Sequence, residues 1–148
     1  MSTLVLEMRP GDMMVVNGAP IRFRNRVRIE LAAKARFLFG KQLMAPEAAT
    51  TPARRIYFAL QTAYIGTEEE RAAGLGLARG LIAEFQEATT SPQARALLAE
   101  ALALAESDDC YRALRLARRV VAHESEVMGL PLPEAPRGRE GGSHDPAR

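Results

Sequence analysis

Hydrophobic positions along this chain follow two periods, one before residue 44 and one after it. In the first part, short apolar runs are separated by turn residues, as is typical of β-strands. Asn17-Gly18 directly follows such a run and is a strong hairpin signal, because both residues tolerate a positive φ angle. Pro10-Gly11-Asp12 marks a further turn. The pattern predicts a compact antiparallel sheet of about five strands over residues 3–43, at 4–8, 13–16, 21–24, 26–31 and 35–39.

The second part carries apolar residues at helical spacing. Four helix starts are predicted, at Thr51-Pro52, at Thr67 before Glu68-Glu69-Glu70, at Ser91-Pro92 and at Ser107-Asp108-Asp109. Gly129 offers a C-cap for the last helix. We therefore expect about four helices over residues 51–129. Because strands and helices are segregated along the chain, the predicted fold class is α+β.

These periods divide the chain into three regions of one domain. A basic β-region spans residues 1–43 and a helical region spans 44–129, whereas the Pro-, Gly- and Arg-rich residues 130–148 are predicted to be a disordered tail. The exposed first strand predicts pairing with a second copy, as a homodimer or larger assembly. No stretch approaches the length of a membrane span and the start lacks a signal-peptide pattern, so a cytoplasmic protein without membrane contact is expected.

Arginine alternates with other residues from Ile21 to Ile29. In a strand this spacing would place Arg22, Arg24, Arg26 and Arg28 on one outer face and send Ile21, Phe23, Val27 and Ile29 into a core. The charge is uneven as well: residues 1–60 hold ten Lys or Arg against four acids, a net +6, and residues 61–148 hold ten against fourteen, a net −4. The basic half is therefore the expected site for RNA or another polyanion. The alternative is a solvated face that protects the sheet edge.

Two further arginines, Arg54 and Arg55, follow Thr51-Pro52 in the first turn of a predicted helix. Cations are unfavourable at this end of the helix dipole, so an anionic partner is expected there, either RNA or an acid such as Glu47. Tyr57 and Phe58 are interpreted as core residues. The candidate RNA contacts are Arg22, Arg24, Arg26, Arg28, Lys34, Arg36, Lys41, Arg54 and Arg55.

The remaining polar residues are interpreted as structural. Arg112, Arg115 and Arg119 share a helix face on which Asp108, Glu124 and Glu126 can pair with them locally. The single cysteine, Cys110, excludes an internal disulfide and is expected to be a small buried residue. His123 and His144 lack the further ligands that a metal site needs. The glycines between Gly74 and Gly80 lie within a helix, so we interpret them as sites of close helix packing.

Three segments together resemble the FlbT family of flagellar-biosynthesis regulators. They are Leu-Glu-Met-Arg-Pro-Gly-Asp-Met-Met-Val-Val-Asn-Gly at 6–18, the block from Met44 that contains Thr-Pro-Ala-Arg-Arg-Ile-Tyr at 51–57, and Asp-Cys-Tyr-Arg-Ala-Leu at 109–114 with Glu-Ser-Glu at 124–126. The resemblance covers roughly residues 4–129. The chain departs from the family pattern at Phe39–Leu43, where many members carry a Leu-Arg-Glu-Lys run.

The resemblance implies post-transcriptional control of flagellin. Family members bind the 5′ untranslated region of flagellin mRNA and control its translation or lifetime, opposite the regulator FlaF, and they differ in the sign of the effect. It implies no catalytic residues and no cofactor, so no enzyme is expected. The alternative function is a chaperone-like adaptor that binds flagellin or FlaF through the helical half without touching RNA.

Overall fold

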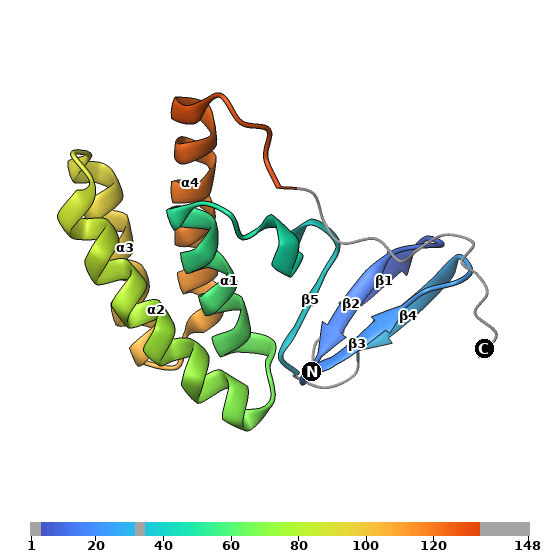
Figure 1. Cartoon of the computed structure of the whole chain (residues 1–148). Coiled ribbons are helices and arrows are strands. Elements are labelled where there is room, and N and C mark those ends of the chain that lie inside the picture. The colour runs from blue at the N-terminus through green and yellow to red at the C-terminus, as the bar shows by residue number, and fades with distance from the viewer. Residues whose placement is uncertain (1–3, 32–34, 134–148) are drawn as a thin grey trace.

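The computed structural model describes residues 4–31 and 35–133. Its strands are β1 (Leu4–Met8), β2 (Met13–Val16), β3 (Ala19–Arg22), β4 (Val27–Leu31) and β5 (Phe37–Phe39). The short 3-10 helices η1 (Gly40–Gln42) and η2 (Pro46–Ala48) lead to α1 (Pro52–Ile65), α2 (Glu68–Ala88), α3 (Pro92–Glu106) and α4 (Cys110–Met128). All strand pairs are antiparallel, and strands precede α-helices along the chain (Figure 1). The predicted α+β class is confirmed.

The strands form two sheets, which corrects the expectation of a single one. β1 pairs with β4, and β2 lies between β3 and β5. Met8 lies opposite Val27 in the first ladder, and Met13 lies opposite Arg22 in the second. The same number of residues separates Met8 from Met13 and Arg22 from Val27, so the two ladders are the halves of one long hairpin. We call this hairpin, residues 4–31, the arm.

The arm is interrupted by the turn that the sequence places at Pro10-Gly11. The Asp12 N–H donates to the Arg9 carbonyl (3.0 Å), and Gly11 has a φ of +90°, as the third residue of a type II turn requires. The Gly11 N–H donates to the Phe23 carbonyl (2.8 Å), and the Phe23 N–H donates to the Asp12 carbonyl (2.9 Å). Gly11 and Asp12 thus oppose one residue, as in a G1 bulge, which bends the strand and divides the ladder.

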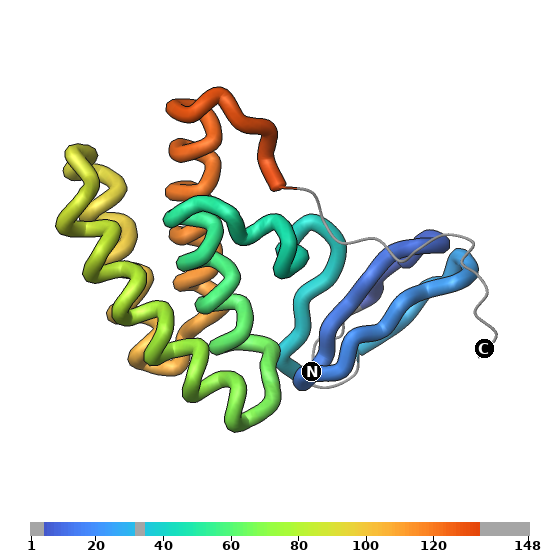
Figure 2. Tube along the Cα trace, in the orientation of Figure 1, coloured from blue at the N-terminus to red at the C-terminus, as the bar shows by residue number. Residues whose placement is uncertain are grey.

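The closed end of the arm is the predicted Asn17-Gly18 hairpin turn. Both residues have positive φ, 50° and 86°, which confirms the prediction. The Asn17 N–H donates to the Arg36 carbonyl (3.0 Å), and a Cβ on Gly18 would lie 3.2 Å from Cγ2 of Thr67. The arm is therefore anchored at this turn, against the α1–α2 connection. In Figures 1 and 2 the arm lies to one side of the helices, with β5 between them, and its interrupted middle lies far from the helices.

Three of the four helix starts are capped as predicted. The Thr51 hydroxyl accepts from the Arg54 N–H (3.2 Å), Thr67 forms a capping box with Glu70, and the Ser91 hydroxyl accepts from the Ala94 N–H (3.1 Å). The fourth start differs: Ser107 ends α3, and α4 begins after Asp109 without a side-chain cap. Gly129 ends α4 with a φ of 70°, as a left-handed C-cap.

The hydrophobic core lies among the helices. α1 packs against both α2 and α4, and α3 packs against α4 and α2. Leu60, Ile82 and Leu98 are fully buried there, and Tyr57, predicted as a core residue, is 3% exposed. None of the helices within residues 4–31 and 35–133 has the length and apolar character needed to cross a bilayer.

The glycines of α2 have different environments. A Cβ on Gly74 would lie 2.9 Å from the Ala59 carbonyl oxygen on α1, so the two helices approach too closely there for any side chain. Gly76 and Gly80 face open space. The prediction of close packing is therefore confirmed for Gly74 and wrong for the other two.

Candidate functional site

Five exposed arginines surround the interrupted middle of the arm. Arg22 ends β3 opposite Met13, and Arg28 lies in β4 opposite Glu7. The other three occupy the β1–β2 turn and the segment joining β3 to β4. We call this set the arginine end; its members are Arg9, Arg22, Arg24, Arg26 and Arg28. Sequence reasoning missed Arg9, because it precedes a turn signal and lies outside the alternating run.

The predicted alternation over residues 21–29 is wrong in its packing. It placed Ile21, Phe23, Val27 and Ile29 in a core beneath one arginine face. Ile21 and Val27 are instead 39% and 38% exposed, and the fully buried side chains of the arm are those of Met8 and Met14. The reason is the interruption between β3 and β4, which breaks the two-residue period. Arg22 and Arg28 therefore lie in different ladders, and Arg24 and Arg26 lie in neither.

The arginine end keeps most of its positive charge. Among the described residues, Arg24, Arg26 and Arg28 form no ion pair with a carboxylate. The Asp12 carboxylate accepts a hydrogen bond from the backbone N–H of Arg9 (2.8 Å), so it stabilises the turn. Glu7 lies opposite Arg28 and offsets one charge locally. Exposed guanidinium groups without an ion-pair partner can form bidentate contacts with phosphate and can stack on unpaired bases.

The other predicted RNA contacts of the β-region are dispersed. Lys34 lies outside the described residues. Arg36 donates to the Asp108 carboxylate (3.0 Å), which ties the start of β5 to the α3–α4 connection. Lys41 is exposed and lines a pocket near Tyr57. These residues therefore do not extend the arginine end.

The two predicted contacts on α1 have different environments. Arg54 is 9% exposed, and its guanidinium donates to the Pro131 carbonyl (2.6 Å) rather than pairing with Glu47. Its Nε has no hydrogen-bond partner among the described residues. Arg55 is exposed and lines a hollow beside Glu84. Burial removes Arg54 from the candidate interface.

The anion at the start of α1 is Glu124, which belongs to α4. Its carboxylate accepts hydrogen bonds from the Thr51 hydroxyl and from the Ala53 N–H (2.9 Å). This contact corrects the expectation that Glu124 pairs with arginines of its own helix. The sequence did hold a signal: the first turn of α1 contains no acid, so the carboxylate that favours its dipole has to come from elsewhere.

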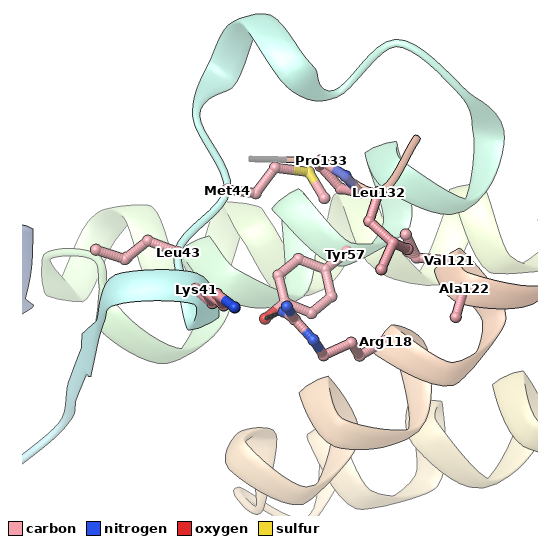
Figure 3. Close-up of a pocket in the computed structure, with 9 residues that line it drawn as sticks. All are labelled: Lys41, Leu43, Met44, Tyr57, Arg118, Val121, Ala122, Leu132 and Pro133. Carbon is pink, nitrogen blue, oxygen red and sulfur yellow. Dashed lines mark hydrogen bonds between the residues drawn. The ribbon is translucent and has the colours of Figure 1, made fainter. Parts of the chain in front are cut away.

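A small pocket lies where η1 meets α1 and α4 (Figure 3). The Tyr57 hydroxyl donates to the Gln42 carbonyl (2.7 Å) and accepts from Arg118 (3.4 Å), whose guanidinium lies 5.9 Å from the Tyr57 ring centre. Burial raises the pKa of Tyr57, and Arg118 partly opposes that shift. The phenol therefore stays protonated at neutral pH. In the figure, Lys41 and Arg118 both reach toward this hydroxyl.

The arginines of α4 pair less with acids than predicted. Arg112 donates to the Asp109 carboxylate (3.4 Å). Arg115 and Arg119 are exposed and form no ion pair among the described residues. They line a hollow of the helical half together with Arg112 and Glu100.

Reactive groups are scarce in the part of the chain that the structure describes. There, no three His, Cys, Asp or Glu side chains come together as a metal site would require. Cys110 is buried as predicted, and burial, reinforced by Asp108, raises the pKa of its thiol. A neutral, buried thiol is a poor nucleophile.

Comparison with known proteins gives a consistent result. The sequence model of a family described as "Flagellar protein FlbT" matches residues 4–128. A protein of Brucella anthropi, named "Probable flagellum biosynthesis repressor protein FlbT", is 31% identical over 134 residues, which cover 88% of this chain and 86% of that protein. A Brucella ovis protein of the same name is 33% identical over 127 residues, 84% of this chain and 81% of that protein. No solved structure matches.

Proposed function

The chain belongs to the FlbT family of flagellar proteins, and from that premise we propose that it regulates flagellin synthesis after transcription. In this proposal it binds the 5′ untranslated region of flagellin mRNA and controls translation or stability of that message. The names of its Brucella relatives support a repressing effect.

The arginine end is the observation that carries this proposal. It gathers five exposed arginines around one bend of the arm, and Arg24, Arg26 and Arg28 have no ion-pair partner among the described residues. Phosphate contacts of this kind supply nearly all of the non-specific affinity of a protein for nucleic acid and a large share of its specific affinity. The arm projects away from the helices, so a leader could approach this end without steric hindrance from them (Figure 1).

A titration of the full chain with labelled flagellin leader RNA tests the proposal. Fluorescence anisotropy should show saturable binding that weakens steeply as salt rises, because bound phosphates release counterions. A segment of the flagellin coding region with the same length serves as the control RNA and should bind more weakly. Absence of saturable leader binding at low salt would refute the proposal.

The adaptor alternative predicts a different salt response. Binding of flagellin or FlaF in an apolar groove of the helical half would depend on buried apolar area, which salt affects far less than phosphate contacts. A complex with either protein that persists at high salt, in the absence of leader binding, would favour the adaptor.

A further inference from the structure

The Tyr57 pocket combines two cations with an apolar lining. Lys41 and Arg118 reach into it from η1 and α4, and the rest of its lining is Leu43, Met44, Tyr57, Val121, Ala122, Leu132 and Pro133. No carboxylate lines the pocket, and neither cation forms an ion pair among the described residues. Two like charges held near one another on such a surface attract an anion.

Exposed apolar side chains also occur in the last turn of α4 and in the segment that leads from it to the pocket. Leu132, at the rim, is 58% exposed. Val127, Met128 and Leu130, which precede it, are 70%, 54% and 38% exposed. A group of exposed apolar side chains next to charged ones is typical of a protein interaction surface.

From this geometry we infer that the Tyr57 pocket binds a segment of a protein partner in which a carboxylate lies beside an apolar side chain. The carboxylate pairs with Lys41 and Arg118 and the apolar side chain packs on Leu132. This function is separate from RNA binding at the arginine end, so either can fail without the other.

Features of the pocket argue against RNA as the occupant. Single-stranded RNA is recognised largely by stacking its bases on accessible aromatic rings. The one aromatic side chain here, Tyr57, is 3% exposed and lies under Arg118. The cavity measures about 60 Å³, which is room for a small group such as a carboxylate.

Small carboxylates can test this site on the full chain by two-dimensional ¹H–¹⁵N NMR. Hexanoate should cause saturable shifts at the Val121 and Ala122 amides. Acetate, which lacks the apolar chain, should bind about tenfold more weakly if two methylene groups are buried. Hexylammonium has the chain but the opposite charge, so it should cause no shift at these amides.

Two pocket variants and one matched control locate the binding. Lys41→Gln and Arg118→Gln should each weaken hexanoate binding by about tenfold, as expected for a lost charged hydrogen bond. Arg115→Gln removes the same charge from an exposed position of α4 that does not line the pocket. The affinity of this variant for hexanoate should therefore equal that of the unmodified protein. A dispersed spectrum of each variant shows that it is folded, and Lys41→Gln leaves the Tyr57–Arg118 contact intact.

Three outcomes would overturn the inference. Absence of saturable shifts with hexanoate would leave the pocket without the proposed ligand class. Equal losses in all three variants would indicate general surface charge. Shifts at Val121 and Ala122 with inorganic phosphate or a ten-nucleotide uridine RNA, but not with hexanoate, would assign the pocket to RNA phosphate.

Discussion

Replacing Arg24, Arg26 and Arg28 together with alanine tests the arginine end as a surface for RNA. For single-stranded RNA, each phosphate contact contributes about 0.7 to the slope of log K against log salt, so losing three should flatten the slope by about 2. At about 0.1 M salt, this linear dependence of log K on log salt predicts leader binding about 100-fold weaker than that of the unmodified protein. At about 0.3 M salt the loss should shrink to roughly tenfold.

The fold should survive this change. The three side chains are exposed, and substitutions at exposed positions usually change stability by no more than about 0.5 kcal/mol each. Arg28 lies opposite Glu7, so its replacement removes one favourable cross-strand pair of similar size. Circular dichroism and urea unfolding would check that the variant is folded before RNA is added.

A matched variant separates contact from overall charge. Replacing Arg112, Arg115 and Arg119 with alanine removes the same charge from α4, far along the chain from the arm. Its leader binding should fall much less, through the long-range field alone. Equal losses in the two triple variants, or an unchanged salt slope in the arm variant, would refute direct phosphate contact at the arginine end. Fluorescence anisotropy over a salt series measures both quantities.

Further predictions concern the helical half. Glu124→Ala should destabilise the protein by about 1–2 kcal/mol in urea unfolding, because α1 loses its cap from α4; unchanged stability would show that this cap contributes nothing. Gly74→Ala should destabilise the protein by about 1–3 kcal/mol because α1 and α2 must separate. Gly76→Ala should stabilise it by up to about 1 kcal/mol. Changes in stability of the same sign for both variants in thermal unfolding would contradict this packing. Burial raises the pKa of Cys110, so its thiol should react with Ellman's reagent at pH 8 far more slowly in the folded protein than in urea. Equal reaction rates in the two conditions would contradict the burial of this thiol.

Local signals predicted the helical half well. Thr51, Thr67 and Ser91 cap the helices expected from their neighbours in the sequence, because an N-cap bonds only two or three residues ahead. The Ser107–Asp109 signal also marked a helix start, because Asp109 is the N-cap of α4, but its side chain forms no capping hydrogen bond.

Non-local contacts were the part that sequence reasoning could not supply. The turn at Pro10-Gly11 was identified, but its hydrogen bonds with Phe23 were not, because that residue is distant in the sequence. Likewise, the sequence predicted an anion at the first turn of α1, but only the fold shows that the Glu124 carboxylate is that anion. The predicted exposure of Arg22, Arg24, Arg26 and Arg28 is confirmed, but the prediction that they share one strand face is wrong, because it required an uninterrupted strand.

The anchoring of the arm has a consequence for how the protein can be redesigned. Of the described arm residues, Met13 and Val15 pack against the main core, both partly buried, and the arginine end contributes nothing to it. Substitutions around the bend at Gly11 can therefore change charge, reach and curvature with little effect on the stability of the helices. The binding surface of the arm can therefore be redesigned at this bend while the helical half stays folded.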